Sequence, residues 1–75
     1  MEIKVYGRLT DIMGNIGFNP EEVVDTDQLK RKLVFLYPDL SDVDYAIAVN
    51  NQIVRGNHPL HKNDVISLLP PFSGG

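Results

Sequence analysis

The chain has 75 residues, no cysteine and a formal net charge of −3 at pH 7. This length predicts a single domain, residues 1–75, and the lack of cysteine excludes disulfide bridges and a thiol nucleophile. The acidic balance argues mildly against nucleic-acid binding, no stretch approaches the roughly 20 apolar residues of a membrane span, and without a signal-peptide pattern we expect a cytoplasmic protein.

The N-terminal segment predicts a β-strand. Residues 2–6, with the sequence EIKVY, alternate polar and apolar side chains, which is typical of a strand with one buried face. Ile3 and Val5 would face the core, because successive side chains of a strand point to opposite sides. The other face would carry Glu2, Lys4 and Tyr6.

The next segment predicts a short helical turn and then a less regular stretch. Gly14 is a suitable end for that turn, since glycine often follows the last residue of a helix. Pro20 excludes a long central strand from residues 15–24, so we expect only a short strand near residues 22–24. The apolar residues at helical spacing in the turn are Leu9, Ile12 and Met13.

Residues 25–38 predict the main helix. Asp25 or Thr26 can cap its N-terminus, and Gln28 follows Asp25 by three residues, as in a capping box. Pro38 ends the helix, because the residue before a proline disfavours helical geometry. The apolar stripe would consist of Leu29, Leu33 and Leu36, and the residues facing solvent would be Lys30, Arg31 and Lys32.

The C-terminal half predicts three strands. Residues 44–54 indicate a strand, a turn at Asn50-Asn51 and a second strand, because asparagine tolerates a positive φ. Residues 55–64 have a loop composition, and residues 65–70 form the last strand. Together the elements predict an α+β domain, with a mixed sheet of about four to five strands and one main helix on one face. The apolar character of the first and last strands predicts central positions for both.

The usual catalytic and metal-binding patterns are weak in this sequence. His58 and His61 lie three residues apart, but no cysteine supplies further ligands for a zinc site, so we expect no metal. Neither a nucleophile motif nor a glycine-rich phosphate loop is present. An enzyme working alone is therefore poorly supported. The acidic residues Asp39, Asp42 and Asp44 lack the calcium-loop pattern and indicate a solvated turn.

The C-terminal sequence LLPPFSGG predicts an extended tail over residues 70–75. Pro70 and Pro71 favour polyproline geometry and a semi-rigid spacer. Phe72 could fold back on the core or anchor in a groove of a partner. Two glycines can pass through a narrow channel, because they carry no side chain. The reactive group of the tail is the Gly75 carboxylate, which ATP could activate as an acyl-adenylate.

The chain resembles the MoaD/ThiS family of sulfur carriers, with a ubiquitin-like β-grasp fold, and within it the small subunits of molybdopterin synthase. The resemblance covers nearly the whole length. It rests on YGRLTDIMG (residues 6–14), on AIAVNNQIV (residues 46–54), and above all on HPLHKNDVISLLPPFSGG (residues 58–75), with its Pro-Pro-x-x-Gly-Gly ending. A β-grasp domain alone would not define a function.

The resemblance implies a carrier that binds no cofactor stably. A ubiquitin-activating-like enzyme would use ATP to adenylate Gly75, which would then become a thiocarboxylate, and Gly74 would keep the tail narrow. The large subunit of molybdopterin synthase would accept the tail, and sulfur would pass to a pterin precursor of the molybdenum or tungsten cofactor. The positions that match the family's partner-facing apolar surface are Tyr6, Ile53, Leu69 and Phe72.

Two departures and three rival functions stay open at this point. The family has a glycine in the turn where this chain reads HKND (residues 61–64), so Asn63 could take a left-handed conformation, and residues 15–24 match the family loosely. The rivals are a sulfur carrier for thiamine synthesis or tRNA thiolation, a ubiquitin-like modifier conjugated through Gly75, and a binding module with an unreactive tail. The Pro-Pro step favours the pterin pathway over thiamine synthesis.

Overall fold

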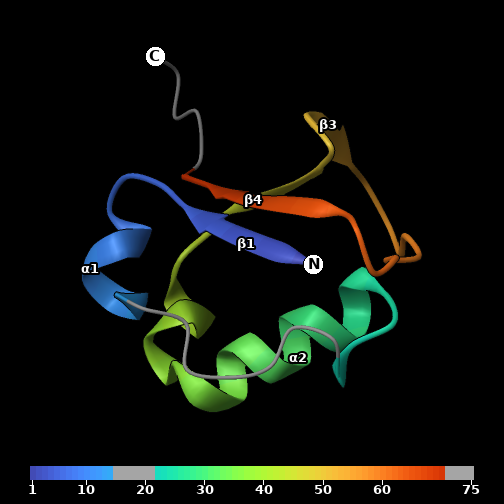
Figure 1. Cartoon of the computed structure of the whole chain (residues 1–75). Helices are drawn as coiled ribbons and strands as arrows, with labels where there is room; N and C mark the ends of the chain where they lie inside the picture. The colour runs from blue at the N-terminus through green and yellow to red at the C-terminus, as the bar shows by residue number, and fades with distance from the viewer. Residues whose placement is uncertain (15–21, 71–75) are drawn as a thin grey trace.

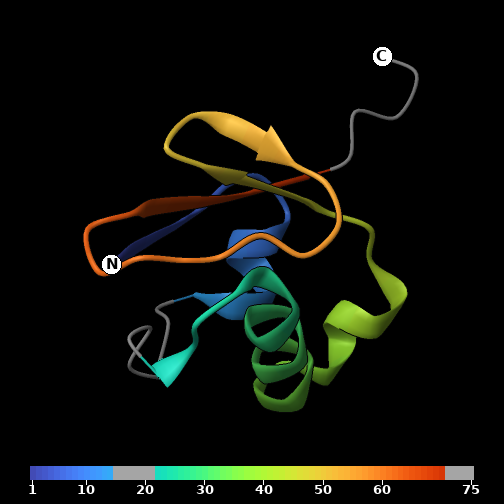
Figure 2. The same cartoon turned by 90° about the vertical axis from the view of Figure 1, so that its right-hand side faces the viewer.

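The computed structural model describes residues 1–14 and 22–70. Its strands form one mixed sheet in the order β1-β4-β2-β3, and Figures 1 and 2 show the helices α1 and α2 on one side of that sheet. The predicted α+β class, with one main helix on a sheet of about four strands, is confirmed. The strands are β1 (Glu2–Val5), β2 (Ala46–Val49), β3 (Gln52–Val54) and β4 (Val65–Leu69), and the helices are α1 (Leu9–Met13), α2 (Thr26–Leu36) and the 3-10 helix η2 (Pro38–Asp42).

The last strand is central in the sheet, as predicted, but the first is not. β4 pairs in parallel with β1 and antiparallel with β2, and its inward side chains Ile66 and Leu68 are 0% and 1% exposed. β1 lies at the edge of the described sheet, where Ile3 and Val5 are half-buried against the core. An apolar inner face is needed at an edge as well as at the centre, so the composition of β1 did not determine its position.

The N-terminus of α2 is capped as predicted, with one difference. The Asp25 carboxylate accepts a hydrogen bond from the Gln28 backbone N–H at 2.8 Å. The Gln28 side chain accepts from the Val24 N–H at 3.3 Å rather than from the capping residue itself. This pairing still satisfies a backbone donor just before the first turn, where donors lack partners within the helix.

Two of the three predicted stripe leucines are in the core. Leu29 and Leu33 are fully buried, whereas Leu36 is 39% exposed, so the prediction for Leu36 was wrong. Leu36 is the last residue of α2, and the buried leucine that follows is Leu40 of η2. Of the three basic residues, Lys30 and Arg31 are exposed as expected, while the Lys32 ammonium contacts the Glu22 carboxylate at 3.1 Å.

The short strand expected near residues 22–24 is absent from that described segment. The only strand-like pairing there is a single bridge between Asp25 and Pro59, flanked by hydrogen bonds from the Thr26 N–H to the His58 carbonyl and from the Leu60 N–H to the Val24 carbonyl, both at 2.9 Å. The pairing does not continue beyond this single bridge. Residues 15–21 lie outside the described residues.

The hairpin turn between β2 and β3 is confirmed. Asn50 and Asn51 have φ values of 51° and 70°, the geometry that a two-residue hairpin turn requires. The left-handed conformation expected at Asn63 was wrong, because within residues 1–14 and 22–70 only these two asparagines have a positive φ among the non-glycine residues. The Asp64 N–H donates to the His61 carbonyl at 3.1 Å, and a type I turn closes this way without a positive φ.

Asp64 joins the hairpin turn to the start of β4. Its carboxylate accepts from the His61 N–H at 2.7 Å and from the Asn50 side-chain amide at 2.9 Å, and Asn50 in turn accepts from the Val65 N–H at 2.9 Å. The pKa of Asp64 is below its ordinary value. The backbone N–H of His61 has the largest effect and the side-chain amide of Asn50 the next, because both donors favour the charged carboxylate.

We expect acid to destabilise the protein partly through Asp64. A carboxyl whose pKa is lower in the folded state stabilises the fold above its unfolded pKa of about 3.9, and this stabilisation is lost as the pH falls through the folded pKa. Urea unfolding from about pH 6 to about pH 2 should therefore show a steeper loss of stability below about pH 4 in the wild type than in Asp64→Asn. Parallel profiles for the two proteins would contradict this assignment.

Candidate functional site

The face of the sheet opposite the helices is uncovered in the described structure (Figures 1 and 2). Alternation along the strands places there the side chains that do not face the core. Two large apolar side chains of this face are exposed, Tyr6 to 44% and Ile53 to 53%. We call this surface the open sheet face, and its residues are Glu2, Lys4, Tyr6, Ala46, Ala48, Ile53, Val65, Ser67 and Leu69.

The pairing of strands brings the apolar residues of this face together. Ile53 of β3 is the partner of Ala48 on β2, and Leu69 of β4 is the partner of Ala46 on β2. Opposite residues on one face lie about 5 Å apart at their Cβ atoms. The small apolar side chains of the two alanines on β2 therefore lie between Ile53 on β3 and Leu69 on β4. The Tyr6 N–H donates to the Leu68 carbonyl at 3.2 Å, which places Tyr6 beside the end of β4.

Three of the four predicted partner-facing residues therefore share one face. Tyr6, Ile53 and Leu69 come from three different strand segments, and only the sheet order makes them neighbours. Phe72 lies outside the described residues. Ala46 and Ala48 were missed by the sequence analysis; their register with Leu69 and Ser67 places them on this face, where Ala46 is half-buried and Ala48 is buried.

The tail begins at the edge of the open sheet face. Leu69 ends β4, and Pro70, the first residue of the predicted tail, is the last residue of the described range. Because β1 and β4 are parallel, their C-terminal ends lie at the same end of the sheet. Tyr6 and Gly7 therefore lie beside Leu69 and Pro70. Gly74 and Gly75, the predicted reactive end, lie outside the described residues.

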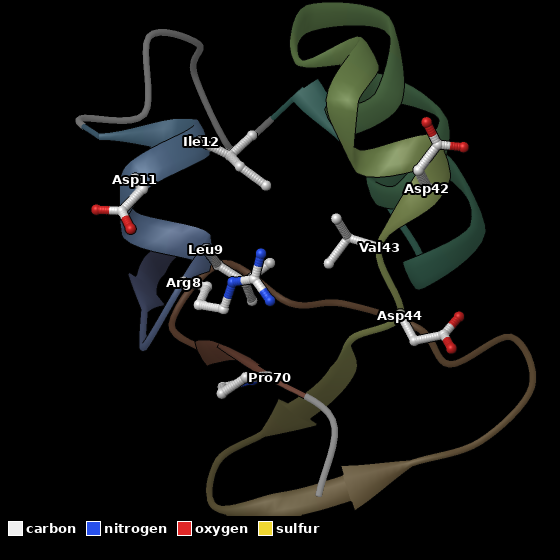
Figure 3. A pocket seen from close by; sticks show the side chains of 8 residues that line it. All are labelled: Arg8, Leu9, Asp11, Ile12, Asp42, Val43, Asp44 and Pro70. Carbon is white, nitrogen blue, oxygen red and sulfur yellow. The ribbon is translucent and has the colours of Figure 1, made fainter. Parts of the chain in front are cut away.

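On the side of the helices, Pro70 borders an open cleft of about 440 Å³. Figure 3 shows Ile12 and Val43 pointing toward one another across this cleft and the Arg8 side chain reaching into it. Asp11 and Asp42 point away from the centre, so their carboxylates do not converge on a common point. Pro70 therefore lies between two surfaces, the open sheet face and this cleft. The remaining lining residues are Leu9 and Asp44.

The two histidines of the loop have structural contacts. The backbone N–H of His58 donates to the Thr26 hydroxyl at 2.9 Å, and the backbone N–H of His61 donates to the Asp64 carboxylate. These hydrogen bonds hold the loop against the N-terminus of α2 and the start of β4. Within the described ranges, no three metal-ligating side chains come together. The same part of the chain contains no helix that is long and apolar enough to cross a membrane.

The fold and the site define a class of protein. A β-grasp domain whose uncovered apolar sheet face adjoins a C-terminal tail ending in Gly74-Gly75 has the organisation of a ubiquitin-like carrier. The ThiS family model matches residues 3–75, and the chain therefore belongs to the ThiS family of sulfur carriers. Carriers of this family are not catalytic themselves, and membership implies a ubiquitin-activating-like adenylating partner.

Proposed function

We propose that the protein carries sulfur as a thiocarboxylate on Gly75. The Gly75 carboxylate attacks the α-phosphorus of ATP and displaces pyrophosphate, which gives an acyl-adenylate. Hydrosulfide then attacks the glycine carbonyl carbon, AMP leaves with one former carboxylate oxygen, a proton is released, and a thiocarboxylate remains. The activating partner catalyses both steps, and the carrier contributes the reacting carbonyl and the surface by which it is bound.

The observation that carries this proposal is the position of the open sheet face. Leu69 ends β4 one residue before Pro70, Tyr6 lies beside the end of β4, and Ile53 is in register with Ser67 through Ala48. A partner that covers this face would have the tail at the rim of its contact surface. Tyrosine is enriched among the residues that contribute most to binding, which supports this role for Tyr6 in particular. We assign partner binding to Tyr6, Ile53, Leu69 and Phe72, and passage through the partner's channel to Gly74.

For the acceptor, we propose the pterin precursor of the molybdenum or tungsten cofactor. In this proposal the chain is the small subunit of molybdopterin synthase, and the large subunit takes the tail into its active site. The sequence LLPPFSGG supports this acceptor through its Pro-Pro step. Thiamine synthesis and tRNA thiolation would use the same chemistry at Gly75 and differ in the acceptor alone.

Intact mass spectrometry tests the chemistry. The protein, ATP, sulfide and a candidate activating enzyme are combined, and we expect a mass increase equal to one oxygen replaced by one sulfur. A variant lacking Gly75 should show no increase, because the chain then ends one residue short of the adenylation site. Adducts on lysines of other proteins without any thiocarboxylate would indicate a protein modifier instead.

The acceptor is tested separately with the protein that carries the Gly75 thiocarboxylate. We expect sulfur transfer to a pterin precursor in the presence of a molybdopterin synthase large subunit, with regeneration of the Gly75 carboxylate. Transfer to a thiamine precursor or to tRNA, and none to the pterin, would reject this acceptor and leave the carrier chemistry in place. The variant lacking Gly75 is the control in each reaction.

A further inference from the structure

Gly7 lies at the point where the end of β1 meets the start of the tail. Its φ is +61°, a conformation that residues with a side chain rarely adopt. A Cβ atom at this position would lie 2.9 Å from Cγ of Pro70 and 3.5 Å from its Cβ and Cδ. The missing side chain of Gly7 therefore leaves the space that the Pro70 ring occupies.

The contact cannot be relieved easily from the side of Gly7. The Gly7 carbonyl accepts hydrogen bonds from the Thr10 N–H at 3.1 Å and from the Thr10 hydroxyl at 2.7 Å, which tie it to the first turn of α1. On the other side, the Tyr6 N–H donates to the Leu68 carbonyl. Gly7 is thus held between a helix and the sheet.

Nor can Pro70 move its side chain away. A proline ring is closed onto its own backbone nitrogen and restricts φ to about −65°, so apart from a change of pucker at Cγ it has no rotamers, and its Cβ and Cδ, 3.5 Å from the added Cβ, move only with the backbone. A displacement of the ring is therefore a displacement of the backbone at Leu69 and Pro70. That backbone is the origin of the tail.

We infer that Gly7 is a positioning residue that sets the origin of the reactive tail relative to the open sheet face. This inference rests on the proposed function of Gly75. Gly75 is five residues after Pro70, and at about 3.3–3.6 Å per residue this distance is at most about 18 Å. A partner that binds the open sheet face receives Gly75 in its active site only when this short tail starts from the right place.

The test compares alanine substitutions at two glycines of the same backbone conformation. Gly56 has a φ of +67°, and a Cβ atom added there would have no atom within 4 Å, so Gly56→Ala has the conformational cost of Gly7→Ala without a contact to the tail. Adenylation is followed by ATP–pyrophosphate exchange with the activating enzyme. For Gly7→Ala we expect kcat to fall about tenfold with KM changed less than about twofold, because the sheet face still binds while Gly75 is misplaced.

Gly56→Ala should keep the kcat of the wild type. Equal kcat values for both variants, or a loss in Gly7→Ala confined to KM, would overturn the inference. If Gly75 of the wild-type protein is not adenylated, the proposed function itself is refuted, so the two failures are distinguishable. If Gly7→Ala does not fold, Gly7→Asn is compared with Gly56→Asn, since asparagine tolerates a positive φ and still brings a Cβ to the Pro70 ring.

A double variant identifies the contact responsible. Pro70→Ala removes the Cγ and Cδ atoms that a Cβ at Gly7 would meet. Relative to the wild type, we expect the kcat of the double variant Gly7→Ala/Pro70→Ala to be higher than the product of the relative kcat values of the two single variants. The reason is that the close contact between the new Cβ and Cγ of Pro70 is removed. Strict multiplication of the single effects would show that Gly7 acts without Pro70 and would overturn the inference.

Discussion

Replacing Ile53 with aspartate is expected to weaken binding to the adenylating partner by about 30-fold or more, which corresponds to about 2 kcal/mol. Ile53 is 53% exposed in the free protein and lies opposite Ala48 on the open sheet face. A partner that covers this face would desolvate the new carboxylate without supplying a charge to pair with it, and a buried unpaired charge is costly. Isothermal titration calorimetry with the activating enzyme measures the change.

The matched control for this substitution is Phe35→Asp. Phe35 is 80% exposed on α2, which lies on the other side of the sheet, so the same change of chemistry is made away from the proposed contact surface. We expect Phe35→Asp to bind like the wild type and both variants to unfold at similar urea concentrations. Equal binding by Ile53→Asp and the wild type would remove the open sheet face from the proposed interface.

Leu33→Ala is expected to lower the free energy of unfolding by about 3 kcal/mol or more. Leu33 is 0% exposed in the middle of the core between α2 and the sheet, so the substitution removes buried methyl groups and leaves a cavity. A domain of this size has a total stability of roughly 4–11 kcal/mol, and the variant would lose a large share of it. Urea unfolding monitored by circular dichroism measures the difference.

Leu36→Ala provides the control within the same predicted stripe. Leu36 is 39% exposed at the end of α2, and we expect a loss of less than about 1 kcal/mol there, because little area is removed from the core. Similar losses for Leu33→Ala and Leu36→Ala would mean that the end of α2 is as tightly packed as its centre. The two leucines look alike in the sequence, so this comparison isolates the effect of burial.

Much of the fold could be predicted because its causes are local. Asp25 and Gln28 lie three residues apart and make the predicted cap, and Asn50-Asn51 adopts the positive φ values that a two-residue turn needs. The tail motif was likewise visible without a structure. In each case the residues that decide the outcome are neighbours along the chain, where propensity and spacing apply directly.

The failed predictions concern both the pairing of distant segments and one local turn. Residues 22–24 read as a strand, but the segment makes a single bridge, between Asp25 and Pro59. Asn63 was expected to replace a glycine, but the turn to Asp64 closes in a form that needs none. Local propensity was overridden in both places by the geometry of the loop that packs against α2.

The sequence by itself determined the elements, the hairpin turn, the helix cap and a chain that ends in Gly74-Gly75, since each depends on residues within a few positions of one another. The tertiary structure decided that β1 lies at the edge of the described sheet, and it set the places of Tyr6, Ile53 and Leu69 relative to one another on the open sheet face. It alone placed Pro70 against Gly7, 63 positions away along the chain. Such contacts arise from how the strands pair and pack, and no local pattern of side chains encodes them.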